Sequence, residues 1–172
     1  SFNDKEYKEK VVLKTQKMKY SGDAVYLGFG LEDDYNGVDV SKKIVIVKGG
    51  DANNTGARAA YGLKNKKEEL AKKNGALGII ELIKTDTETW GYINHNFNRD
   101  RLEVLTEEID QSSKEGGFAY LWLHDEYGTY ALDFSNNPII PMNLMMEGEN
   151  IVPVNSQNVI GMIEGTDPDL KN

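Results

Sequence analysis

The stretch from residue 43 to residue 83 decides the fold, because it joins two strand patterns through a helix pattern. The runs Lys43-Ile-Val-Ile-Val47 and Leu77-Gly-Ile-Ile-Glu-Leu-Ile83 are nearly continuously apolar, as expected for strands covered on both faces. Between them, Lys66-Lys-Glu-Glu-Leu-Ala-Lys-Lys73 consists of strong helix formers. Asn74-Gly75 then supplies the left-handed residue that ends a helix. The stretch therefore predicts a strand, a helix and a second strand.

The helix pattern is clearest from Asn65 to Asn74, with an alternative start near Thr55 to Ala60 and a weak point at Gly62. Thr85 to Phe97 shows no clear period, which predicts a long polar loop with embedded aromatics. A second helix is predicted farther on, where apolar residues recur at i, i+3 and i+7. These residues are Leu102, Leu105 and Ile109.

Segments rich in β-branched and aromatic residues predict about seven strands. They are Val11 to Leu13, Ala24 to Phe29, Lys43 to Val47, Leu77 to Ile83, Phe118 to Leu123, Tyr130 to Phe134 and Val159 to Ile163. With 172 residues and no linker or repeat, the chain is expected to form a single domain, residues 1–172. The predicted class is α+β: a mixed sheet or open barrel flanked by two or more helices.

Charge is distributed unevenly along the chain. Residues 1–83 carry 15 Lys and Arg against 12 Asp and Glu, whereas residues 84–172 carry 5 against 16. The acidic half disfavours nucleic acid as a partner, since phosphate binding needs a continuous basic face. The lysine-rich run from Lys64 to Lys73 is interrupted by Glu68 and Glu69, which predicts a solvated helix face. No apolar run approaches the ~18 residues of a membrane span.

The residue inventory offers no self-contained catalytic site. The chain has no cysteine and two histidines, so it can build neither a thiolate site nor a three-histidine metal site. Gly28 to Asp33 lacks the third glycine of a dinucleotide fingerprint. Glu32 to Asp39 resembles a calcium loop, but Lys43 stands at its twelfth position, so a structural turn is favoured. His124-Asp125-Glu126 is interpreted as a solvated strand end rather than an acid/base or metal site.

Three internal segments carry a resemblance to a known family. Asp34-Tyr-Asn-Gly-Val-Asp-Val-Ser-Lys-Lys-Ile-Val-Ile-Val47 resembles the turn and strand of the protease-associated domain, and Gly75-Ala-Leu-Gly-Ile-Ile80 resembles its next buried strand. Upstream, Gly22-Asp-Ala-Val-Tyr-Leu-Gly-Phe-Gly30 resembles the strand that leads into this domain in zinc-dependent exopeptidases. Lys42 departs from the pattern, because the family usually has glycine there.

The tail is the most specific part of the resemblance. Asn158-Val-Ile-Gly-Met-Ile-Glu-Gly-Thr-Asp-Pro-Asp-Leu-Lys171 is similar to the segment that precedes the first metal ligands in zinc peptidases of the aminopeptidase Y and glutamate carboxypeptidase-like family. Residues 155–172 would then be the connection into a catalytic domain beyond this chain. Residues 84–154 match only in length and strand content, and none of the family's catalytic or zinc-binding residues falls on a position of this sequence.

The resemblance implies a non-catalytic protease-associated domain of swivelling β/β/α type, belonging to a secreted zinc aminopeptidase and covering its active-site cleft. It implies an extracellular or periplasmic location. As partners it implies a catalytic domain of the same polypeptide and peptide or protein substrates. Zinc would sit in that catalytic domain, with no cofactor in this chain. Trp90, Tyr92 and His95 are the candidate contact residues, although Trp90 could instead anchor its segment to the sheet.

Two further hypotheses stay open. The first is a stand-alone peptide- or glycan-binding module with the same fold. The second is an independent hydrolase that uses the acidic residues beside His124, although the spacing indicates no activity.

Overall fold

The computed structural model describes residues 10–14, 17–98 and 117–146, and these residues form one mixed sheet with helices on it. The strands are β1 (Lys10–Lys14), β2 (Met18–Tyr26), β3 (Ile44–Lys48), β4 (Gly78–Ile83), β5 (Ala119–His124) and β6 (Ile139–Met146). The helices are α1 (Ala57–Lys73), α2 (Thr87–Phe97) and α4 (Thr129–Asn136), with a 3-10 helix η2 (Glu32–Tyr35). The class is therefore α+β.

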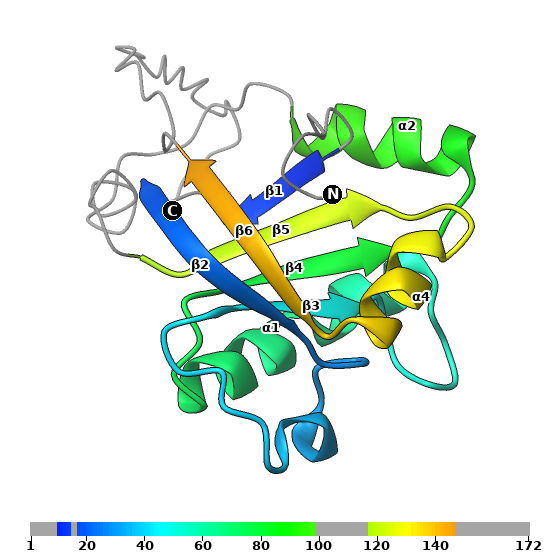
Figure 1. The fold of residues 1–172 in the computed structure, drawn as a ribbon. Coiled ribbons are helices and arrows are strands. Elements are labelled where there is room, and N and C mark those ends of the chain that lie inside the picture. Colours follow the sequence, from blue (N-terminus) through cyan, green and yellow to red (C-terminus); the bar gives the residue numbers. More distant parts are fainter. Residues whose placement is uncertain (1–9, 15–16, 99–116, 147–172) are drawn as a thin grey trace, which may run out of the picture.

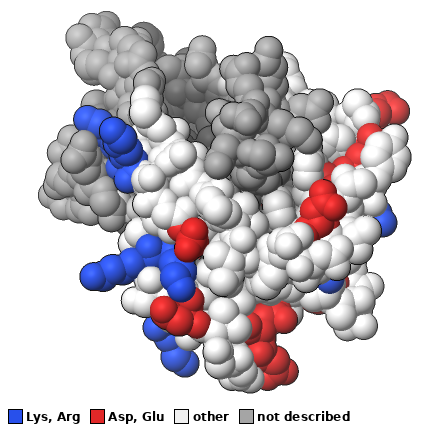
Figure 2. Space-filling view, viewed as in Figure 1, with Lys and Arg blue, Asp and Glu red and all other residues white. Residues whose placement is uncertain are grey.

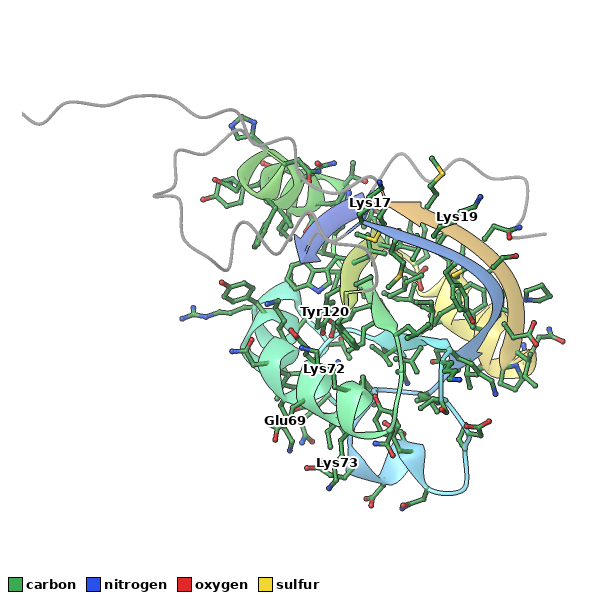
Figure 3. The ribbon with its side chains drawn as sticks, turned by 90° about the vertical axis from the view of Figure 1, so that its left-hand side faces the viewer. Lys17, Lys19, Glu69, Lys72, Lys73 and Tyr120 are labelled. Carbon is green, nitrogen blue, oxygen red and sulfur yellow. The ribbon has the colours of Figure 1, made fainter. Side chains whose placement is uncertain are left out.

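The sheet has the strand order β1-β5-β4-β3-β2-β6. Strands β2 to β5 run parallel to one another, while β1 and β6 close the two ends antiparallel. In Figure 1 the long β2–β6 pair crosses in front of β3, β4 and β5, so the sheet is strongly curled. Helices α1 and α2 lie against the other face of the sheet, as the turned view in Figure 3 shows.

Curling the sheet creates two apolar cores. The first fills the space between the sheet and helices α1 and α2, and its larger members are Val45, Val47, Ile79, Ile83, Trp90, Tyr120 and Trp122. The second lies inside the curl and is closed by α4, with Ile44, Ile46, Leu82, Leu121, Phe134, Ile140 and Met142 among its members. Successive residues of β3 and β4 point alternately into the two cores, which explains their continuous apolar sequences.

The strand, helix and strand predicted between residues 43 and 83 are confirmed as β3, α1 and β4. Helix α1 uses the earlier of the two expected starts and runs through Gly62, where no neighbouring group lies close. Gly75, with φ +80°, follows its end. Lys42 adopts φ 59°, a left-handed backbone conformation that glycine favours.

One predicted strand, Tyr130 to Phe134, is wrong, because this segment lies in helix α4. The buried carboxylate of Asp125 accepts hydrogen bonds from the backbone N–H groups of Tyr130 (3.1 Å) and Ala131 (3.0 Å). These are donors of the first helical turn, which a helix cannot satisfy internally. In the helix, Tyr130 and Phe134 are one turn apart, and their rings stack on the same side.

The loop predicted from Thr85 to Phe97 is also wrong, since Thr87–Phe97 forms helix α2. Asp86 caps it by accepting from the backbone N–H of Thr89 at 2.8 Å. Trp90, Ile93 and Phe97 form a short stripe at i, i+3 and i+7 that packs into the first core. Polar residues on the rest of the helix hide this stripe in the sequence.

Strand β6 is absent from the sequence prediction because Pro141 interrupts its pattern. Proline is compatible with an edge strand, where one side of the backbone needs no partner, and β6 occupies the end of the sheet. Six strands are thus described, of which five were predicted. The expected strand Val159 to Ile163, the helix through Leu102 and the family-like tail lie outside the described residues.

Candidate functional site

A buried polar network lies between α1 and the sheet. The Lys67 ammonium donates to Glu81 Oε1 at 2.6 Å and to the backbone oxygen of Lys48 at 2.8 Å. The other carboxylate oxygen, Glu81 Oε2, accepts from Tyr120 OH at 2.9 Å and from Trp122 Nε1 at 2.7 Å. Figure 3 shows Tyr120 next to α1. The network links β3, β4, β5 and α1 around one carboxylate.

Strand register explains how this network is assembled. In the parallel β4–β5 pair, Glu81 lies opposite Trp122, and Ile79 lies opposite Tyr120. Residues two apart on a strand share a face, so Tyr120 and Trp122 flank the Glu81 carboxylate from the same side of the sheet. Helix α1 places Lys67 over that position.

The network corrects the expectation of a fully solvated helix face on α1. Lys67 and Glu81 are fully buried, and Glu68 is 9% exposed, whereas Glu69, Lys72 and Lys73 do lie on the outer side. The signal for this site was Glu81 itself, since a charged residue in the middle of a buried strand must be paired.

Burial shifts the ionisation of this network. Desolvation lowers the pKa of Lys67, although the neighbouring Glu81 charge opposes the shift. Desolvation also raises the pKa of the Tyr120 phenol, and the Glu81 charge adds to it. Shifted pKa values are common at active sites, but structural ion pairs produce them as well. Because these side chains have no solvent contact and their charges are paired, the network stabilises the fold rather than meeting a substrate.

The acidic residues that suggested calcium or acid/base chemistry are used by the backbone and neighbouring side chains. Asp34 Oδ2 accepts from the N–H groups of Phe29 (3.1 Å) and Leu31 (3.0 Å), which builds the structural turn around η2. Asp125 is 3% exposed and caps α4, so it is not part of a solvated strand end. Glu126 accepts from the Thr87 hydroxyl at 3.1 Å.

The three candidate contact residues divide between the two sides of α2. Trp90 is 3% exposed, and its ring stacks on His124 with centroids 5.0 Å apart and planes 4° apart. His124 Nε2 in turn lies 2.8 Å from the backbone oxygen of Thr85. Trp90 therefore anchors α2 to the end of β5, which is the second of the two roles that the sequence allowed for it.

Tyr92 and His95 lie on the outer side of α2. Tyr92 is 72% exposed, and His95 is also exposed. Residues three apart on a helix are neighbours, with Cβ atoms about 5–6 Å apart, so the ring and the imidazole form one contact surface. We refer to Tyr92 and His95 as the α2 outer face. It offers an aromatic ring and an imidazole that can form hydrogen bonds, on a helix whose other side is anchored to the sheet.

Metal ligation and membrane crossing find no support in the described ranges 10–14, 17–98 and 117–146. Within them, no group of three or more His, Asp or Glu side chains is placed to hold a metal ion. Nor does any helix in these ranges have the length and apolar character needed to cross a bilayer.

Comparison with known proteins gives limited similarity. No protein-family model matches the sequence, and no curated protein matches it either. Among solved structures, the chain is similar to an aminopeptidase from Aneurinibacillus sp. strain AM-1, with 18% identity and a TM-score of 0.45. The match covers 78% of this chain and 27% of that one, so this chain spans about a quarter of the aminopeptidase.

Proposed function

We propose that this chain is a non-catalytic, protease-associated-type domain of a secreted zinc aminopeptidase, and that the α2 outer face contacts peptide substrate near the active-site cleft. The peptidase parent rests on the sequence resemblance of residues 34–47, 75–80 and 158–171. A fold hosts many functions, so the step from architecture to substrate contact needs its own observation.

The observation that carries the proposal is the construction of α2. Its inner side is held by Trp90 stacked on His124, and its first turn is capped by Asp86. Its outer side presents Tyr92 and His95 to solvent. A contact surface gains precision when it sits on a rigid element, and an exposed tyrosine provides contact area at low entropic cost.

The decisive experiment uses the longer polypeptide in which, according to the proposal, this domain is joined to a zinc aminopeptidase domain. Tyr92→Ala and His95→Ala should raise KM for oligopeptides and leave kcat and the hydrolysis of a small aminoacyl chromogenic substrate unchanged. Glu88→Gln, an exposed change in the first turn of the same helix, is the matched control. Equal KM values for the two alanine variants and the control would contradict the assigned contact.

A second measurement tests the non-catalytic role. The isolated chain, supplied with zinc and the same chromogenic substrate, should give no hydrolysis, and metal-dependent turnover would overturn the proposal. If calorimetry shows that the isolated chain binds peptides or glycans, and its gene encodes no peptidase domain, the stand-alone binding module replaces it.

A further inference from the structure

The chain contains two Asn-Gly pairs, Asn36-Gly37 and Asn74-Gly75, and the structure holds them differently. We propose that Asn36 is a site of spontaneous deamidation and isoaspartate formation, with water as the only co-reactant, and that the fold protects Asn74 from the same reaction. The two pairs share the same chemistry, so their hydrogen bonding decides the difference.

Asn74 is held at the end of α1. Its side-chain Nδ2 donates to the backbone oxygen of Leu70 at 2.8 Å, and its own N–H donates to the same oxygen at 3.1 Å. The N–H of Gly75 donates to the backbone oxygen of Lys72 at 3.0 Å. Both the leaving amide and the attacking nitrogen are therefore engaged in hydrogen bonds.

Asn36 and Gly37 follow η2 in an exposed turn. Among the described residues, neither the Asn36 side chain nor the Gly37 N–H has a hydrogen-bond partner. A Cβ built on Gly37 would meet nothing within 4 Å. The backbone bonds that brace the turn, Asn36 N–H to Asp33 O and Val38 N–H to Tyr35 O, are both 3.2 Å long. Rotation of this peptide therefore disturbs little of the fold.

The reaction needs only groups already present. The deprotonated Gly37 nitrogen attacks the Asn36 side-chain carbonyl carbon, a new C–N bond closes a succinimide, and the side-chain amide nitrogen takes up a proton and leaves as ammonia. Water then adds to one of the two ring carbonyls and breaks its bond to the ring nitrogen. Opening on one side gives an ordinary aspartate at this position, and opening on the other routes the backbone through the side-chain carbon as isoaspartate. No oxidation state changes.

The product changes an already acidic turn. Each conversion adds one negative charge to a chain whose formal charge is −8. The new carboxylate joins Glu32, Asp33 and Asp39. Figure 2 shows acidic side chains at the lower edge, where η2 lies in Figure 1. The isoaspartate form also lengthens the main chain between buried Tyr35 and Val40, so it alters the spacing of two residues anchored in the first core.

Peptide mapping of the intact folded chain, aged in mildly alkaline buffer, tests the proposal. Asn36 should convert at least about tenfold faster than Asn74, because hydrogen bonds that are absent at Asn36 must break at Asn74. In guanidinium chloride the two sites should convert at rates within about twofold of each other, since the unfolded chain keeps neither set of bonds. Asn36→Gln should remove the acidic species that ion exchange separates, and Asn74→Gln should leave it.

Two results would overturn the inference. One is conversion of Asn74 in the folded chain as fast as that of Asn36. The other is a rate difference that persists in denaturant, because it would assign the selectivity to neighbouring sequence rather than to the fold.

Discussion

The buried network around Glu81 and the α2 outer face are built in opposite ways. Glu81 is fully buried, and both of its carboxylate oxygens accept hydrogen bonds. Tyr92 and His95 instead stand in solvent on a helix whose other side is anchored. The comparison shows that polar chemistry alone does not identify a functional surface, because the densest polar network is sealed inside the fold and out of reach of a partner.

The largest expected effect comes from removing the centre of the buried network. Glu81→Ala leaves the Lys67 charge buried without its partner and leaves Tyr120 OH and Trp122 Nε1 without an acceptor. Breaking a buried pair in this way costs about 3–5 kcal/mol of unfolding free energy. Denaturant titration measures it, with the exposed Glu69→Ala on α1 as control. Equal losses in the two variants would mean that the network contributes little.

Two buried tryptophans sharpen the comparison, because Trp122 belongs to the Glu81 network and Trp90 lies on the inner side of α2. Trp122 Nε1 donates to Glu81, whereas the buried Trp90 Nε1 has no acceptor among the described residues. Replacing either ring by phenylalanine removes similar volume, but only Trp122→Phe also takes a donor from a buried carboxylate. Trp122→Phe should therefore cost about 1.5–3 kcal/mol more than Trp90→Phe. Denaturant titration of the two variants measures the difference. Equal unfolding midpoints and equal m-values for Trp122→Phe and Trp90→Phe would refute it.

Asp125 connects the end of β5 to α4 and should give an intermediate effect. Asp125→Ala removes the acceptor of two N–H groups in the first turn of α4, which should cost about 1–2 kcal/mol, as for other helix caps. Asp125→Asn keeps one acceptor oxygen and should lose less. Thermal unfolding of the two variants against the parent chain measures both losses, and a larger loss in the asparagine variant would argue against capping.

The smallest expected effect concerns acid stability of α2. Hydrogen bonds from Thr89 hold the pKa of the Asp86 carboxyl below its usual range. A carboxylate with a depressed folded pKa adds stability above its unfolded pKa, and this stability is lost as pH falls through the folded pKa. Asp86→Asn removes that titration, so stability should fall less steeply below about pH 4. Denaturant titrations at a series of acidic pH values measure this dependence. If the unfolding free energies of the parent chain and of Asp86→Asn fall equally steeply with pH, Asp86 does not contribute in this way.

Local pattern predicted the part of the fold between β3 and β4. The apolar runs there are long, helix formers lie between them, and Gly75 marks the end of α1 at a positive φ. The local pattern failed for α4, because its aromatic residues are equally compatible with a strand. The helix forms there because the Asp125 carboxylate accepts hydrogen bonds from the N–H groups of its first turn. The local pattern failed again at α2, where a three-residue apolar stripe is too short to stand out among polar neighbours.

For the candidate contact residues, too, the sequence predicted one part and the tertiary structure decided the other. Aromatics in a polar segment drew attention to Trp90, Tyr92 and His95, but without a helix their orientation could not be assigned. Once α2 forms, the turn of about 100° per residue separates Trp90 from the other two. The buried network left one visible trace, Glu81 within an apolar strand, while its partner Lys67 resembled any lysine on a charged helix.

By itself, the sequence determined what depends on neighbours along the chain: the α+β class, the β3–α1–β4 succession and the Asn-Gly turns. Only the tertiary structure decided what depends on distant segments. It curled the sheet and paired Lys67 with Glu81, which are 14 positions apart in the sequence. It also buried Trp90 while leaving Tyr92 of the same helix exposed. The physical reason is that burial and hydrogen-bond partners are properties of three-dimensional packing, and they set both the charge state and the accessibility of each side chain.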